Sequence, residues 1–160
     1  SEEDGLPLER VRGQGSGVRG QKLKIVVVRL RYIANFTDFD PFMYEPDVEV
    51  VYSLRPEEIE NADVVFLPGS KNTVQDLLFL RENGIEANIT RAAEKKIPVI
   101  GICGGYQMLG KKILDPFCIE SMFREVDGIG LLNTETIFER TKTTCQVEAE
   151  TTGAWVMGHG

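Results

Sequence analysis

Four short apolar runs, rich in β-branched residues, constrain the fold of this 160-residue chain more than any other feature. They occupy residues 23–30, 48–52, 63–67 and 97–102. Runs of this length with little polar alternation are typical of strands that are buried on both faces of a sheet. Pro98 fits such a strand only near its beginning, because proline cannot donate a hydrogen bond to a neighbouring strand.

Helical patterns separate these runs. Residues 56–59 (Pro-Glu-Glu-Ile) suit the first turn of a short helix. Apolar residues recur at helical spacing in residues 73–82 and 85–96, and residues 106–112 form a third helix after the fourth run. Strands that alternate with helices indicate an α/β fold with a mainly parallel sheet and helices on both faces.

The pattern changes towards the C-terminus. Residues 130–138 and 143–149 read as extended, alternating segments joined by a polar connection. We predict that they pair as an antiparallel hairpin at the edge of the sheet.

Residues 1–22 read as a tail or linker, because this Gly-rich, polar stretch has too few large apolar groups to offset its chain entropy. Residues 15–20 match G-x-G-x-x-G letter for letter. A dinucleotide fingerprint follows a strand and opens a helix, and this stretch does neither, so we reject the nucleotide-binding interpretation.

Charge and cysteine content narrow the function classes. The formal net charge of -7 argues against nonspecific binding to nucleic acid or to an anionic membrane surface. No apolar run approaches the ~20 residues that span a bilayer. The three cysteines and the one histidine have no metal-ligand spacing, so we expect no metal site and a reduced, cytoplasmic setting.

The fourth apolar run leads into a glycine-rich turn at residues 101–107, Gly-Ile-Cys-Gly-Gly-Tyr-Gln. The spacing G-x-C-x-G is the thiol version of the nucleophile elbow, a strained strand-to-helix turn whose flanking glycines avoid clashes. We predict that Cys103 is a nucleophile, with its thiolate favoured by the helix N-terminus. The alternative is a small buried hydrophobic residue, which is the role we predict for Cys118 and Cys145.

The third apolar run leads into a second unusual loop at residues 67–73, Leu-Pro-Gly-Ser-Lys-Asn-Thr. Parallel strands place the loops at their carboxyl ends along one edge, where ligands bind. We predict that the amides of Gly69, Ser70 and Gly104 form an oxyanion hole for a tetrahedral intermediate. Gln107 lies one helical turn past the nucleophile, so we predict that it contacts substrate; the alternative is a solvated helix residue.

These two loops resemble those of the triad-type (class I) glutamine amidotransferases. Residues 29–41, 128–136 and 142–147 resemble, more narrowly, the cobyric acid synthase family. The likeness covers residues 24–149, and it is specific in the strings Asn-Phe-Thr-Asp-Phe-Asp-Pro and Leu-Pro-Gly-Ser-Lys-Asn-Thr. The cysteine turn is shared by the wider superfamily.

The resemblance implies a flavodoxin-like fold and makes Cys103 the family's nucleophile towards glutamine. It implies that residues 1–22 link to a preceding ligase domain that uses ATP and Mg²⁺. Residues 23–160 are then a glutamine amidotransferase domain without a cofactor of its own. The resemblance further implies that ammonia released from glutamine amidates side-chain carboxylates of a corrinoid in cobalamin biosynthesis. The corrinoid is bound through the ligase domain.

The sequence departs from the family at the catalytic histidine, which the family places in a Gly-Tyr-Glu-Ile-His string. His159 is the only histidine here, and it lacks the preceding Tyr-Glu-Ile. We expect the true base to lie beyond Gly160, so that the domain is truncated and shows little turnover. A catalytically inactive docking module is therefore an open alternative. A different amidotransferase, which acts on a cell-wall lipid precursor or on the a,c carboxylates of cobyrinic acid, is another, and the Asn-Phe-Thr-Asp-Phe-Asp-Pro string argues against it.

That string, at residues 35–41, allows two interpretations. Thr37 or Asp38 caps a short helix over residues 39–44, with the aromatic side chains in the core. Alternatively, its polar groups frame the glutamine pocket or contact the ligase domain.

Overall fold

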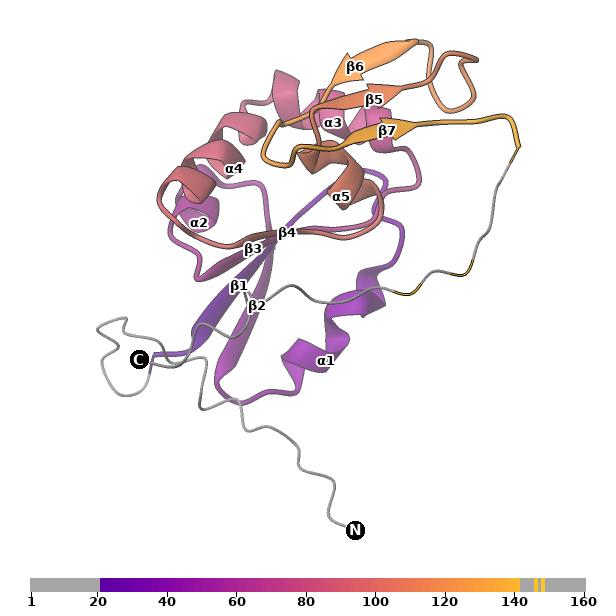
Figure 1. Cartoon of the computed structure of the whole chain (residues 1–160). Coiled ribbons are helices and arrows are strands. Elements are labelled where there is room, and N and C mark those ends of the chain that lie inside the picture. Colours follow the sequence, from indigo (N-terminus) through magenta and orange to yellow (C-terminus); the bar gives the residue numbers. More distant parts are fainter. Residues whose placement is uncertain (1–20, 142–145, 147, 149–160) are drawn as a thin grey trace. The chain divides into compact units, whose positions relative to one another are not determined.

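The computed structural model describes residues 21–141, 146 and 148. Its main sheet has four parallel strands in the order β2-β1-β3-β4 (Figure 1). The strands are β1 (Leu23–Val28), β2 (Val48–Ser53), β3 (Val64–Leu67) and β4 (Val99–Gly101). All four predicted strands form, and the predicted mainly parallel α/β sheet is confirmed.

The strand order fixes where a ligand would bind. The chain leaves β1 to one side for β2 and returns to the other side of β1 for β3, so the direction of winding reverses between β1 and β3. In sheets of this flavodoxin-like order, ligands bind outside the carboxyl ends of the strands at that reversal. The loops that follow β1, β3 and β4 begin at this edge.

One face of the sheet is covered by four helices. Val26, Val28, Val65 and Leu67 of the sheet belong to one apolar cluster with buried side chains from these helices. The helices are α2 (Pro56–Glu60), α3 (Thr73–Glu82), α4 (Ile85–Glu94) and α5 (Gly104–Leu109). The bounds of α3 are those predicted, whereas α5 begins and ends earlier than the predicted helix over residues 106–112.

The other face of the sheet is covered by the segment that follows β1. Phe39 is fully buried there against Ile25, Val27 and Phe66. It ends the 3-10 helix η2 (Phe36–Phe39), which continues into α1 (Asp40–Met43) on the side of the sheet away from α5 (Figure 1). Helices therefore lie on both faces, as predicted.

The cap of this segment differs from the prediction of Thr37 or Asp38. Asn35 has an extended backbone, and its side-chain oxygen accepts a hydrogen bond from the Thr37 N–H at 3.2 Å. An Asx residue two positions before a free amide satisfies it in this way. The helical turn therefore starts earlier, while the expected burial of an aromatic residue is confirmed for Phe39.

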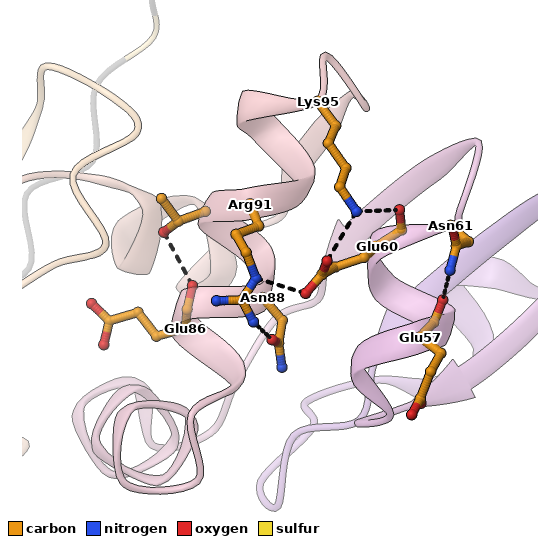
Figure 2. Close-up of polar contacts among 8 residues, drawn as sticks. Glu57, Glu60, Asn61, Glu86, Asn88, Arg91 and Lys95 are labelled. Carbon is orange, nitrogen blue, oxygen red and sulfur yellow. Dashed lines mark hydrogen bonds and ion pairs between the residues drawn. The ribbon is translucent and has the colours of Figure 1, made fainter.

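A polar contact joins α2 and α4 across their outer surfaces (Figure 2). The Glu60 carboxylate accepts hydrogen bonds from Arg91 Nε at 2.8 Å and from Lys95 Nζ at 2.9 Å. These two hydrogen bonds lower the pKa of Glu60 below its ordinary value of 4.5. Arg91 also donates to the Asn88 side chain, so that its guanidinium is held from both helices.

A second, smaller sheet packs three short strands in the order β6-β5-β7. They are β5 (Lys112–Leu114), β6 (Glu125–Asp127) and β7 (Glu135–Ile137). β5 pairs antiparallel with β6 and parallel with β7. The hairpin predicted at the edge of the main sheet is corrected in this respect: β7 belongs to the smaller sheet and pairs with β5. Most of its predicted partner segment, residues 143–149, lies outside the described residues.

Gly110 explains why the predicted helix over residues 106–112 ends early. A Cβ at this position would lie 2.7 Å from the Thr134 carbonyl oxygen, so the chain approaches the β7 region closely. The Lys111 N–H then donates to the same Thr134 oxygen at 2.7 Å, which starts the pairing of β5. Tertiary pairing thus overrides the helical pattern of this segment.

Candidate active site

Cys103 lies between β4 and α5 with φ of 49° and ψ of -112°. Positive φ is uncommon for a residue other than glycine, and it costs of order 1–3 kcal/mol unless the surroundings enforce it. The thiol is exposed. The strained turn that the G-x-C-x-G spacing predicts is therefore present, and Cys103 is not the buried hydrophobic residue of the alternative interpretation.

The glycines of this turn are required by close backbone contacts. A Cβ at Gly105 would lie 1.9 Å from the Leu67 carbonyl oxygen, and one at Gly101 would lie 2.6 Å from both Cα and N of Tyr106. Neither contact leaves room for a side chain, because the neighbouring atoms belong to the backbone. The glycines therefore let the start of α5 sit directly against the end of β3.

The loop after β3 lies against the same turn. A Cβ at Gly69 would be 3.7 Å from Cys103 Cβ, and one at Gly104 would be 3.0 Å from the Ser70 nitrogen. Among the backbone hydrogen bonds that the described residues form in turns, loops and caps, none is donated by the amides of Gly69, Ser70 or Gly104. An oxyanion hole requires such amides beside the nucleophile, and this role of the three residues stays a prediction.

Gln107 joins this group from α5. Its side-chain Oε1 lies 3.4 Å from Thr73 Oγ1 on α3, a long and therefore weak hydrogen bond. Thr73 Oγ1 would in turn be 2.9 Å from a Cβ at Gly104. The half-buried Gln107 amide therefore lies close to the turn, and its contact with substrate stays a prediction.

A β-bridge joins the segment that follows β1 to the loop that follows β3. Ile33 and Ser70 form an antiparallel bridge, in which the Ala34 N–H donates to the Gly69 oxygen at 2.8 Å and the Lys71 N–H donates to the Tyr32 oxygen at 2.7 Å. The chain that leads into the Asn35–Pro41 string is therefore hydrogen-bonded to the loop beside Cys103. The string begins at the site, as its place after β1 predicts.

Asp76 is a residue of this region that the sequence interpretation missed. Its side chain is fully buried on α3, and its carboxylate accepts hydrogen bonds from Arg31 N–H, Tyr32 N–H and Ser70 Oγ. A signal was available in the sequence: Asp76 interrupts the buried stripe of α3 next to Leu77. A carboxylate at such a position requires partners, because an unpaired buried charge is very costly.

The other candidate residues do not gather here. Cys118 is exposed and has φ of 52°, which corrects the prediction that it is buried. It lies on a tight loop in which the Asp115 carboxylate accepts hydrogen bonds from the amides of Ile119, Glu120 and Ser121. Cys145 and His159 lie outside the described residues.

The pKa values of Asp115 and Glu120 are shifted in opposite directions in this loop. Burial favours the neutral acid, but the three amide hydrogen bonds outweigh it and hold the pKa of Asp115 below its ordinary value. The pKa of neighbouring Glu120 is raised by its burial and by the Asp115 charge.

Within residues 21–141, no group of three or more His, Cys, Asp or Glu side chains could hold a metal ion. No helix there is long and apolar enough to cross a membrane.

Comparison with known proteins decides the family. Residues 24–160 match the family model described as the CobB/CobQ-like glutamine amidotransferase domain. The chain belongs to this family. It is 49% identical over 148 residues to a cobyric acid synthase of Thermodesulfovibrio yellowstonii, a match that covers 92% of the chain. It is 47% identical over 150 residues to that of Syntrophobacter fumaroxidans and 46% over 156 residues to that of Desulfitobacterium hafniense, covering 92% and 95% of the chain.

The chain spans about 30% of the length of these curated relatives. The resemblance drawn from residues 24–149 is confirmed at the level of the family. The CobB/CobQ-like match includes both loops of the candidate site, residues 67–73 and 101–107.

Proposed function

We propose that this domain hydrolyses glutamine to glutamate and ammonia, with Cys103 as the nucleophile. One observation carries the proposal: an exposed thiol on a strained strand-to-helix turn, with free amides of the neighbouring strand's loop beside it. Membership of a glutamine amidotransferase family supplies the substrate. An activated thiol and oxyanion amides are two of the parts that acyl transfer by a cysteine uses, together with a general base.

The chemistry follows from this arrangement. The Cys103 sulfur attacks the side-chain amide carbon of glutamine, and negative charge develops on the amide oxygen. The amides of Gly69, Ser70 and Gly104 hold that oxygen. The proton of the Cys103 thiol passes through a general base to the amide nitrogen, the C–N bond breaks, and the nitrogen leaves as ammonia while a thioester remains on the sulfur. Water then attacks the thioester, releases glutamate and returns the thiol.

We propose further that the ammonia serves a cobyric acid synthase. The relatives at 46–49% identity carry that name, which supports the assignment. In this proposal a ligase domain that uses ATP and Mg²⁺ amidates corrinoid side-chain carboxylates with the ammonia. Gln107, which lies near the thiol, is assigned to glutamine binding.

A labelling experiment tests the nucleophile. A diazo-ketone analogue of glutamine is incubated with the protein, and the labelled peptides are identified by mass spectrometry. We expect Cys103 to be labelled fastest and glutamine to slow its labelling, because Cys103, unlike Cys118, lies beside the proposed oxyanion site. Preferential labelling of Cys118 or Cys145 would contradict the proposal.

Iodoacetamide supplies the control, because its reaction with an exposed thiol does not depend on an oxyanion site. Cys118 is exposed and is therefore expected to react with it. In the full-length protein, release of ammonia from glutamine that is lost in Cys103→Ser separates an active glutaminase from an inactive docking module. A protein that binds its ligase partner but releases no ammonia would favour the docking module.

A further inference from the structure

Asp76 connects the three segments that surround the Cys103 turn. Asp76 Oδ1 accepts the Arg31 N–H at 2.9 Å and the Tyr32 N–H at 3.2 Å, both in the segment after β1. Asp76 Oδ2 accepts the Ser70 hydroxyl at 2.6 Å, in the loop after β3. The carboxylate itself is carried by α3. A single buried group therefore ties these elements together at the carboxyl edge of the sheet.

Hydrogen bonds, and no ion pair within the described part of the chain, hold the Asp76 carboxylate. In the described ranges, no lysine or arginine side chain forms an ion pair with it. Its stabilisation therefore comes from the amide and hydroxyl hydrogen bonds, which are short and strong when the acceptor is charged. The two segments can then separate from α3 only by leaving a buried charge without partners.

The bond to Ser70 reaches the candidate oxyanion hole. Ser70 Oγ donates to Asp76 and accepts the Asn72 N–H at 3.0 Å, so the hydroxyl is held both as donor and as acceptor. The backbone nitrogen of the same residue lies beside Gly104, 3.0 Å from the position of a Cβ there. Fixing the hydroxyl therefore fixes the orientation of the amide.

We propose that Asp76 is a positioning residue, which holds the amides of Gly69 and Ser70 at the place where the oxyanion forms. The inference rests on the proposed glutaminase function for its catalytic consequence. It rests on the hydrogen bonds alone for its structural content. Asp76 touches no reacting atom and acts through Ser70 and through the Ile33–Ser70 bridge.

The test replaces Asp76 with asparagine in the full-length protein. Asparagine keeps the size and one acceptor oxygen, but the group facing Ser70 becomes a donor. Asp115→Asn is the matched control, because Asp115 is similarly buried and also accepts several loop hydrogen bonds, but beside the smaller sheet. Ser70→Ala removes the bond between Asp76 and the oxyanion loop, together with the bond from the Asn72 N–H, and leaves the Arg31 and Tyr32 bonds of Asp76 in place.

Steady-state glutaminase kinetics give the first readout. Loss of one oxyanion donor lowers kcat by about 10²–10³-fold, so we expect misplacement of the amides in Asp76→Asn to lower kcat by roughly 10–100-fold, with KM nearly unchanged. Ser70→Ala is expected to follow it. Asp115→Asn is expected to lose stability while kcat per folded molecule stays within about twofold of wild type. Equal kcat in Asp76→Asn and Asp115→Asn would overturn the proposal.

Amide hydrogen exchange gives a readout that does not depend on activity. The Ala34 and Lys71 amides bond across the two segments, and we expect both to exchange faster in Asp76→Asn than in Asp115→Asn. Unchanged exchange at both amides would overturn the proposal even in an inactive protein. If wild type released no ammonia while exchange rose as expected, the glutaminase function would fail and the structural part of the inference would stand.

Discussion

Replacing Gly105 with alanine pushes a methyl group into the backbone of β3. The new Cβ would lie 1.9 Å from the Leu67 oxygen, 2.5 Å from the Leu67 carbonyl carbon and 2.7 Å from the Pro68 oxygen. Cβ atoms essentially never approach closer than 3.0 Å, so the contact with the Leu67 oxygen is short by about 1.1 Å. Both sides of the contact are backbone, so α5 or β3 must move as a unit.

The expected cost follows from that displacement. Overpacking a well-packed site costs about 1–3 kcal/mol, and a clash between two backbones belongs at the upper end, near 3 kcal/mol. For a chain of this size, such a loss lowers Tm by roughly 6–12 °C. Urea unfolding followed by circular dichroism measures the loss, as a lower midpoint at unchanged slope.

Two other glycines calibrate the measurement. Gly84 has φ of +73° with nothing within 4 Å of an added Cβ, so Gly84→Ala reports backbone strain alone, about 1 kcal/mol. A Cβ at Gly69 would make only ordinary contacts, 3.5 Å from Ala34 Cβ and 3.7 Å from Cys103 Cβ, so Gly69→Ala should change stability by less than about 0.5 kcal/mol. If Gly105→Ala cost no more than Gly84→Ala, the seating of α5 on β3 would be refuted.

Two further outcomes test the surface of the helical layer. The pKa of Glu60 is lowered by its hydrogen bonds to Arg91 and Lys95, so its contribution to stability is present above pH 4.5 and is lost as the pH falls through its folded-state pKa. Glu60→Gln should therefore flatten the acid limb of a stability-pH curve, and an unchanged limb would contradict this. Asn72 accepts the Gln75 N–H at 3.2 Å as the cap of α3, so Asn72→Ala should cost about 1 kcal/mol in urea unfolding. Wild-type stability in that variant would exclude the cap.

The sequence predicted the main sheet because its strands carry their own signal. Each apolar run is local, and the helices between the runs have helical periodicity, so both could be located without knowing their partners. The second sheet left no such trace. Its strands have three residues each, and β5 continues from a helical segment, so its pairing depends on contacts between distant segments. The periodicity of one segment does not identify the distant segment with which it pairs.

In the candidate site, too, local sequence patterns predict some residues, whereas others depend on contacts between distant segments. Cys103 was found because the steric demands of its turn are met by glycines two residues away, within one short string. Asp76 was missed because two of its three partners, Arg31 and Tyr32, lie about 45 residues away along the chain. Cys118 was predicted to be buried from the general behaviour of cysteine, whereas its exposure depends on how the Asp115 loop folds back on itself.

Strand register explains why the thiol and the amides meet at all. Leu67 of β3 pairs with Gly101 of β4. Gly69 and Cys103 each lie two residues beyond this pair. In parallel strands, residues that are equally far from a paired position lie at the same height at the edge of the sheet. The Ile102 N–H then bonds the Leu67 oxygen at 3.0 Å, and the Gly105 N–H bonds the Ile102 oxygen at 2.8 Å. These bonds hold Cys103 on both sides in its positive-φ conformation, so the strain of the turn is maintained by the same register that places the amides beside it.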